Sequence, residues 1–347
     1  MKAWEENIRR VVPYVPGEQP QGEGLIKLNT NENPYPPAPG VLKALKNMDG
    51  QLLRKYPDPA ASELVEALAK FYGLKNHQVF VGVGSDDVLA MAFLTFFHSE
   101  KPILFPDITY SFYPVWADLF GIPYETPALN QDFQIKTEDY YGENGGVIFP
   151  NPNAPTGIYL PMKGVEDILA HNQDVVVIVD EAYIDFGGTS ARTLLNRYEN
   201  LLVVGTFSKS RSMAGVRIGY AFGSPALIKA MENVKYSYNS YTMNLPSIRL
   251  GVEALKDKDY FYRTIEKIVD TREKAKVRFR ELGFQCLDSS ANFLFITHRE
   301  RKAEEILQAL RSRKIYVRHF NTPRLSNYLR VTIGTDDEME AVYRNIL

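Results

Sequence analysis

The sequence contains one cysteine, Cys286, among 347 residues, so no disulfide bond can form within the chain. A lone thiol is typical of a reducing compartment, and the first residues include Glu5 and Glu6 without the apolar segment of a secretory signal. No stretch reaches the roughly 18 consecutive apolar residues that a transmembrane helix needs. These absences predict a cytoplasmic protein that does not span a membrane.

A strong excess of charge is also lacking, because 40 Lys and Arg residues face 42 Asp and Glu residues, for a net charge of −2. Nucleic-acid binding usually requires a clearly basic face, so it is not predicted. The five histidines are scattered, none with metal-ligand spacing, and no Walker A motif occurs. We therefore expect no metal site and no nucleotide hydrolysis. His319 stands beside a candidate substrate residue, although a role in a surface loop fits it better.

The length and a hydrophobic content of 45% favour a globular protein of two domains. Short apolar segments alternate with helical patterns in the middle of the chain, and their unbroken apolar character suits parallel strands covered on both faces. This alternation predicts a three-layer α/β domain with a mostly parallel sheet. The expected strands are 79–81, 103–105, 147–149, 175–179 and 201–204.

The flanking regions differ from this middle part. The first 40 or so residues are rich in Pro, Gly and Asn, especially residues 29–40, and predict an extended arm with turns. Ser62 is then expected to cap a helix that Gly73 ends. Beyond residue 250 an α+β pattern predicts a smaller domain, with a long helix ended by Gly283 and a last helix that begins with the capping box Thr335 to Glu338. The expected division is an N-terminal arm with part of the small domain (1–45), a large cofactor-binding domain (46–247) and a small C-terminal domain (248–347).

Ligands of open α/β sheets bind at the carboxyl ends of the strands, so the residues that follow each strand are informative. Gly84, Ser85 and Asp86 follow the first strand and lead into a helix. A fresh helix N-terminus favours a phosphate, because its amide groups lack partners and the helix dipole attracts anions. An ordinary glycine turn with a capping side chain explains the same segment.

Two further strands end in residues of opposite charge. Asp180 follows the strand at 175–179 and suits a cationic ligand atom, although a helix cap or a surface turn is an alternative. Lys209 follows the strand at 201–204; a lone lysine there is commonly structural, but an amine at this edge can form a Schiff base and relay protons. Together with the phosphate-binding candidates Thr206, Ser208 and Arg217, they provide the groups that pyridoxal phosphate needs.

With these residues in place, the chain resembles the fold-type I pyridoxal-phosphate-dependent aminotransferases, and within them the histidinol-phosphate aminotransferases. The resemblance extends over nearly the whole chain, and the order and spacing of its motifs are specific. These motifs are residues 28–34, 54–57, 84–86, 152–157, 180–183, 206–209, 291–293 and 329–334.

The resemblance implies a role for each cofactor residue. Lys209 would be the catalytic amine, Asp180 would pair with the pyridinium nitrogen, Tyr183 would bond the ring hydroxyl and Tyr110 would stack on the ring. Tyr56 would reach the cofactor phosphate of a neighbouring subunit, so a homodimer is implied. The residues implied around the phosphate are Gly84, Ser85, Asp86, Thr206, Ser208 and Arg217.

The resemblance also implies the substrate contacts. Arg318 and Arg330 would bind an anionic group, and Tyr14 and Asn31 of the N-terminal arm would close over the substrate. The family has an asparagine directly before Pro-Thr-Gly, where it bonds the ring hydroxyl, but this chain has Ala154. Tyr183 alone, Asn153 or a water molecule would have to take over that bond.

The implied reaction interconverts L-histidinol phosphate and 2-oxoglutarate with imidazole-acetol phosphate and L-glutamate, a step of histidine biosynthesis. An aromatic amino-acid aminotransferase is the first alternative, because the same site accepts flat aromatic side chains. A decarboxylase such as threonine-phosphate decarboxylase and a non-catalytic binding protein are further alternatives. The presence of Lys209 argues against the last of these.

Overall fold

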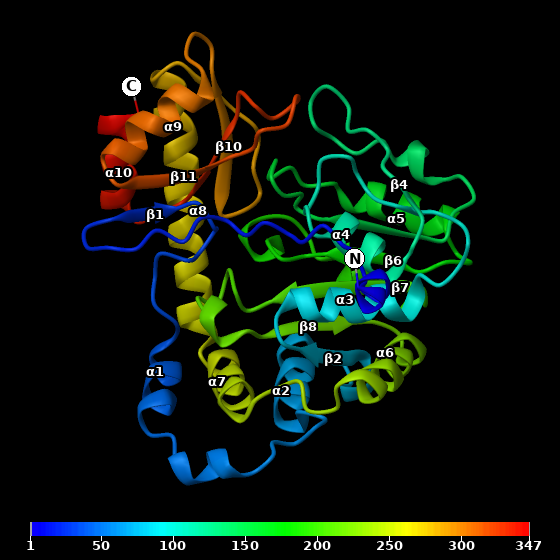
Figure 1. Cartoon of the computed structure of the whole chain (residues 1–347). Coiled ribbons are helices and arrows are strands. Elements are labelled where there is room, and N and C mark those ends of the chain that lie inside the picture. The colour runs from blue at the N-terminus through cyan, green and yellow to red at the C-terminus, as the bar shows by residue number, and fades with distance from the viewer. Residues whose placement is uncertain (1, 347) are drawn as a thin grey trace.

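The computed structural model describes residues 2–346, which contain two β-sheets with helices packed on them (Figure 1). The larger sheet has the order β2-β8-β7-β6-β5-β3-β4. Its strands from β4 to β7 are parallel to their neighbours, whereas β8 runs antiparallel to both β7 and β2. The strands are β2 (Val79–Gly82), β3 (Ile103–Leu104), β4 (Tyr124–Glu125), β5 (Gly146–Pro150), β6 (Val177–Asp180), β7 (Leu201–Thr206) and β8 (Gly219–Phe222).

Successive residues of the central strands face opposite sides of this sheet. In β5, Val147 and Phe149 pack in one apolar cluster, whereas Ile148 packs in the other. The first cluster includes α2 (Ser62–Tyr72), α5 (Met162–His171) and α7 (Leu245–Lys256), and the second includes α3 (Ser85–Phe96), α4 (Tyr113–Phe120) and α6 (Pro225–Tyr238). Both faces are therefore covered, which confirms the predicted three-layer α/β architecture.

The smaller sheet has the order β1-β11-β12-β10-β9. Its strands are β1 (Ile26–Leu28), β9 (Phe284–Cys286), β10 (Phe293–His298), β11 (Ile315–His319) and β12 (Leu329–Thr332). Helices α8 (Lys258–Glu281), α9 (Ala303–Ser312) and α10 (Asp336–Asn345) contribute to its apolar cluster. Because β1 pairs in parallel with β11, the N-terminal part of the chain joins a sheet formed mainly by its C-terminal part. The predicted domain boundaries stay predictions, and the one at residue 247 lies within α7.

The helix caps predicted from the sequence are confirmed at some helix ends and wrong at another. The capping box of Thr335 and Glu338 is confirmed, and Gly73 ends α2 in the left-handed conformation with φ of 70°. The expectation for Ser62 is wrong, because the carboxylate of Asp58 caps the turn instead and accepts from the amides of Ala60 and Ser62. Within residues 2–346, no helix has the length and apolar character to cross a bilayer.

Candidate active site

The carboxyl ends of β5, β6 and β7 lie side by side, because these strands run parallel. Asp180 is the last residue of β6, Thr206 is the last residue of β7, and Lys209 follows shortly after β7. These groups border a cavity of about 150 Å³, which we call the inner cavity. Its lining includes nine of the predicted cofactor residues, namely Ser85, Asp86, Tyr110, Asp180, Tyr183, Thr206, Ser208, Lys209 and Arg217.

The N-terminus of α3 and the guanidinium of Arg217 form an anion-binding corner of the inner cavity. Arg217 Nη2 lies 3.3 Å from Asp86 Oδ2, and Nη1 lies 3.4 Å from Ser208 Oγ. Gly84 has φ of 84°, and a Cβ atom at this position would lie 2.3 Å from Arg217 Nη2. The glycine is therefore required for the arginine to reach the helix N-terminus, whose free amides favour a phosphate.

Asp180 is a buried carboxylate that lines the inner cavity. Tyr113 Oη donates to its Oδ2 at 2.9 Å, and the amide of Ala182 donates to its Oδ1 at 3.2 Å. Burial raises the pKa of Asp180 to about 6, and the two hydrogen bonds oppose this rise. Among residues 2–346, no cation forms an ion pair with it, so the carboxylate is suited to a positively charged ligand atom.

Lys209 and two tyrosines lie where the inner cavity opens towards the N-terminal arm. Lys209 Nζ donates to the carbonyl of Thr30 at 3.0 Å and lies 5.8 Å from the ring centroid of Tyr183. Tyr110 Oη donates to Asp86 Oδ1 at 2.9 Å, which fixes the ring beside the phosphate corner. The amine is thus held at the border between the strand ends and the arm.

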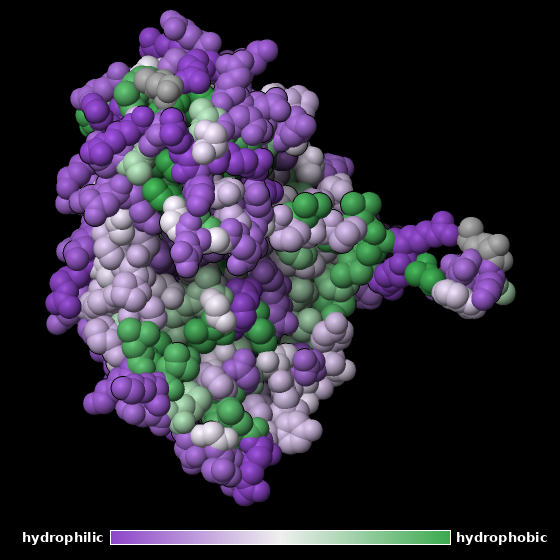
Figure 2. Space-filling view, turned by 60° about the vertical axis from the view of Figure 1, so that its left-hand side comes forward, coloured by the Kyte–Doolittle hydropathy of each residue, from purple (hydrophilic) through white to green (hydrophobic). Residues whose placement is uncertain are grey.

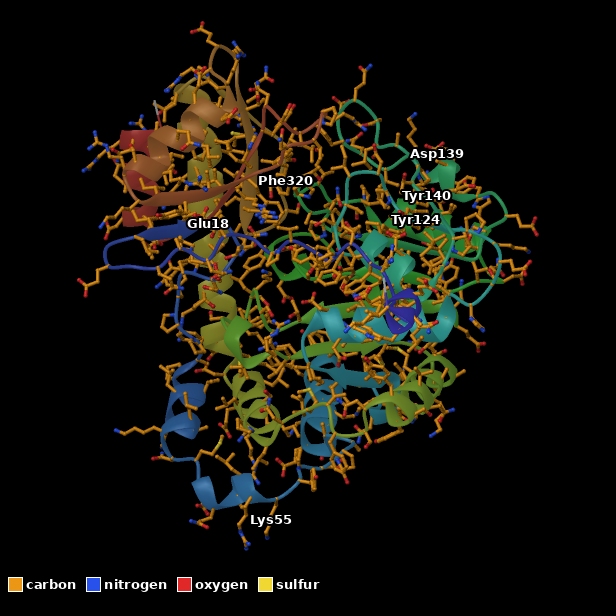
Figure 3. All side chains as sticks on the ribbon, in the orientation of Figure 1. Glu18, Lys55, Tyr124, Asp139, Tyr140 and Phe320 are labelled. Atoms are coloured by element: carbon orange, nitrogen blue, oxygen red, sulfur yellow. The ribbon has the colours of Figure 1, made fainter. Side chains whose placement is uncertain are left out.

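A second cavity of about 170 Å³ adjoins the first, and we call it the outer cavity. Ala154, Tyr183, Tyr110 and Lys209 line both cavities. The predicted substrate residues Tyr14, Asn31, Arg318 and Arg330 all lie in the outer cavity, together with Phe320. Figure 3 labels Phe320, which lies on the side of the smaller sheet that faces the larger one.

The outer cavity has the electrostatic character of an anion site. Arg330 is half-buried; its Nη2 donates to the carbonyl of Asn29 at 3.0 Å, and its Nε has no partner among residues 2–346. Burial lowers the pKa of the Arg330 guanidinium, and the positive charge of Arg318 adds to this effect. No carboxylate lines the cavity, so an anionic substrate group would satisfy both arginines.

Tyr56 lies outside both cavities of its own chain. Its side chain is 83% exposed, and its ring centroid lies 4.8 Å from that of Tyr241. The adjacent Lys55 is labelled at the lower edge of the molecule in Figure 3, far from Phe320. Tyr56 therefore does not reach this chain's cavities, and its role across subunits stays a prediction.

Several contacts of the site were not anticipated from the sequence. Tyr113 binds Asp180, Thr30 binds Lys209, and Thr332 binds the side chain of Asn31. Tyr113 follows Tyr110 by three residues in the first turn of α4, and this spacing was the available signal. His319 does not line either cavity; its Nε2 lies 2.7 Å from the carbonyl of Ser326, and residues 2–346 contain no cluster of metal ligands.

Residues 23–346 match the family model of the class I and II aminotransferases, and the chain therefore belongs to this family. Within it, the chain is similar to histidinol-phosphate aminotransferase 1 of Hydrogenovibrio crunogenus, with 52% identity over 96% of this chain and 94% of the relative. It is also similar to the histidinol-phosphate aminotransferase of Pseudomonas putida, with 50% identity over 98% of this chain and 97% of the relative.

Solved structures show the same fold. The histidinol-phosphate aminotransferase of Sinorhizobium meliloti in complex with pyridoxal-5′-phosphate has a TM-score of 0.85 at 24% identity, covering 92% of this chain and 89% of that one. The corresponding enzyme of Clostridium acetobutylicum has a TM-score of 0.85 at 21% identity, covering 93% and 98%. The predicted resemblance to fold-type I aminotransferases is confirmed.

Proposed function

We propose that this chain is a pyridoxal-phosphate-dependent aminotransferase that converts L-histidinol phosphate and 2-oxoglutarate into imidazole-acetol phosphate and L-glutamate. The observation that carries the proposal is the pair of arginines, Arg318 and Arg330, in a cavity that adjoins Lys209 and contains no carboxylate. Two cationic groups suit a phosphate on one substrate and carboxylates on the other. The identity of 52% to a histidinol-phosphate aminotransferase over nearly the full length supports the same reaction.

The residues of the inner cavity fit the cofactor. Asp180 is a buried carboxylate that lacks a cation, and Arg217 with the N-terminus of α3 provides a corner for a phosphate. A side chain at position 84 would collide with the guanidinium of Arg217, so the phosphate corner requires a glycine there. When bound, pyridoxal phosphate supplies the electron sink that amino-group transfer requires.

With the cofactor bound, Asp180 would keep the ring nitrogen protonated, Arg217 and Ser208 would hold the phosphate, and Tyr110 would cover the ring. Lys209 Nζ would hold the cofactor aldehyde in the absence of substrate. Once the substrate amine has displaced it, the free Lys209 amine would carry the proton at the substrate Cα. Arg330 and Arg318, which line the outer cavity together with Lys209, would orient the substrate through its anionic group.

A substrate panel tests the reaction. Purified protein with added cofactor should turn over L-histidinol phosphate with 2-oxoglutarate at a higher kcat/KM than phenylalanine or tyrosine, because only the phosphorylated substrate presents a dianion to the two arginines. A preference for the unphosphorylated aromatic amino acids would replace the proposal with an aromatic aminotransferase. Release of carbon dioxide from threonine phosphate without formation of a keto acid would point to a decarboxylase.

The active form is proposed to be a homodimer in which Tyr56 enters the partner's inner cavity. Exposed apolar groups support this arrangement: Leu42 and Leu45 of α1 (Pro39–Lys46) and Leu53 of η2 (Gly50–Arg54) lie near the exposed Tyr56 in sequence. Figure 2, in which this side is turned forward, shows hydrophobic surface among hydrophilic residues.

The N-terminal segment offers further exposed apolar side chains. Figure 2 shows this segment, with η1 (Ala3–Asn7), projecting from the body, and its residues Val12 and Val15 are 82% and 74% exposed. Such surface favours a protein partner.

Mixing two inactive variants tests the shared site. Lys209→Ala and Tyr56→Ala each damage every site of their own dimer, but a mixed dimer contains one site with both native residues. Random exchange of subunits should restore about a quarter of the wild-type sites. Activity that stays at the level of the separate variants would show that Tyr56 does not act across subunits.

A cytoplasmic location is proposed as well, because Cys286 is the only cysteine and the proposed reaction is biosynthetic. The partners are then small amino-acid and keto-acid substrates and a second copy of the chain, without nucleic acid or membrane. Cell fractionation with an antibody against the native protein checks this location.

A further inference from the structure

Ala154 places a methyl group between the two cavities, where the family pattern has a hydrogen-bonding amide. The preceding residue, Asn153, does not take over this function. Its Nδ2 donates to the carbonyl of Ile108 at 3.0 Å and to Thr156 Oγ1 at 3.1 Å. Since an amide nitrogen carries two protons, both are engaged, and Asn153 has no donor left for a ligand.

Asn31 is held at each of its polar groups. Its amide donates to Thr332 Oγ1 at 3.1 Å, its Oδ1 accepts from the same hydroxyl at 3.0 Å, and its carbonyl accepts from Asn292 Nδ2 at 3.0 Å. The backbone has φ of 59°, a conformation that asparagine tolerates better than most residues. Because the Thr332 proton goes to Oδ1, the nitrogen of the side chain is the atom that faces Tyr183.

This orientation decides the direction of the Tyr183 hydroxyl. Asn31 Nδ2 donates to Tyr183 Oη at 2.9 Å, so the phenol oxygen accepts this bond and keeps its own proton for a further acceptor. Within residues 2–346, no protein group accepts that proton. Tyr183 borders both cavities, and its ring packs edge-on against Phe293 with the centroids 5.1 Å apart. The proton is therefore free for a ligand oxygen.

We propose that Asn31 is a positioning residue that compensates for Ala154 by holding the Tyr183 proton towards the ring hydroxyl oxygen of the cofactor. The inference rests on the proposed function, because it concerns bound pyridoxal phosphate. A hydrogen-bond donor to the ring hydroxyl oxygen would stabilise the anionic form of that oxygen. The proton that this oxygen shares with the nitrogen of Lys209 would therefore be lost at a lower pH. Thr332 belongs to the smaller sheet. Through Asn31 and Tyr183, this sheet therefore influences the acidity of the cofactor's ring hydroxyl, which is bound at the edge of the larger sheet.

Spectroscopic pH titration of the visible band of the holoenzyme tests the proposal. Asn31→Asp replaces the donor with an acceptor of nearly the same shape, which turns the Tyr183 hydroxyl away from the cofactor. Thr332→Val removes the hydroxyl that orients Asn31 and keeps the side-chain volume. The titration midpoint should rise by about 1 pH unit in the first variant and by about 0.5 unit in the second.

Two further variants make the test specific. Ala154→Asn should lower the midpoint of the wild type, because it adds a second donor, and should return the midpoint of Asn31→Asp towards the wild-type value. The matched control is Thr297→Val in the neighbouring strand β10, where the hydroxyl accepts from Asn327 Nδ2 at 3.2 Å; it should leave the midpoint unchanged.

The experiment distinguishes a failure of the proposed function from a failure of the role proposed for Asn31. A wild-type chain that binds no cofactor and shows no visible band would overturn the proposed function. A wild type that titrates normally, with midpoints of Asn31→Asp and Thr332→Val equal to its own, would overturn the role of Asn31 alone, whatever the midpoint of Ala154→Asn. Should Asn31→Asp fail to fold, the midpoint of Thr332→Val decides the question.

Discussion

The inner and outer cavities share four lining residues but differ in how their charges are balanced. In the inner cavity, Arg217 pairs with Asp86, and Asp180 accepts two hydrogen bonds from protein donors. In the outer cavity, Arg318 and Arg330 lie together without a carboxylate, and Arg330 Nε has no partner among residues 2–346. The comparison indicates an inner cavity with preformed contacts and an outer cavity whose charge is completed by the substrate.

The largest expected effect is at the border between the cavities. Lys209→Ala should reduce kcat by at least about 10³-fold, because it removes the group that moves the proton at the substrate Cα. Steady-state kinetics and loss of the lysine-bound visible band check this. Lys229→Ala, which alters an exposed lysine of α6, is the matched control and should behave as wild type. Turnover that is retained in Lys209→Ala would show that the residue between the two cavities does not carry out the proton transfer.

The next effect tests the charge of the outer cavity. Arg330→Met should lower kcat/KM for histidinol phosphate by about 100-fold, since it removes charge-assisted hydrogen bonds to a substrate anion. Cofactor affinity should hardly change, because Arg330 does not line the inner cavity. Arg344→Met, at an exposed position of α10, serves as the control. Equal losses of cofactor and substrate binding would contradict the separation of the two cavities.

A smaller effect concerns the pH dependence of the inner cavity. Burial raises the pKa of Asp180 from 3.8 to about 6 without a bound cation, so the carboxyl group takes up a proton as the pH falls through about 6. A cationic ring must then displace that proton, and cofactor affinity should fall by up to about tenfold per pH unit below this value. Equilibrium dialysis against pH measures the slope.

Asp180→Asn is the control for this slope, because it removes the titrating group while the cofactor's own ionisations remain. The variant should bind the cofactor more weakly at neutral pH and should lose the part of the slope that Asp180 contributes. Identical slopes in the wild type and the variant would show that the carboxyl group does not titrate in this range.

The smallest effect is expected for Tyr113→Phe, which removes one hydrogen bond to Asp180 and nothing that touches the substrate. Cofactor affinity should fall about fivefold at neutral pH, in line with the loss of roughly 1 kcal/mol. Because the Tyr113 bond lowers the pKa of Asp180, its removal should also move the pH dependence to higher pH. An affinity equal to that of the wild type would show that the Ala182 amide alone orients the carboxylate.

The sequence was most informative where a site is built from short segments at strand ends. Asp180 and Lys209 were found because each follows an unbroken apolar run, and parallel strands bring such ends together. The strands β1, β4, β8, β9 and β11 were missed. Two of these, β1 and β8, pair with strands that are distant in sequence, β1 with β11 and β8 with β2, so no local pattern indicates the pairing. The expected Ser62 cap was wrong because Asp58, four residues earlier, accepts from the amide of Ser62, the first residue of the helix.

The sequence by itself determined the fold class, the class of chemistry and the residues around the inner cavity, because these depend on local periodicity and on motifs of a few residues. Only the tertiary structure decided how Ala154 is accommodated. The bonds that orient Asn31 come from Thr332, which is 301 residues away, and from Asn292, which is 261 residues away. No local pattern encodes them, because they form only when β1 joins the smaller sheet and brings the arm that follows it to Thr332 of β12.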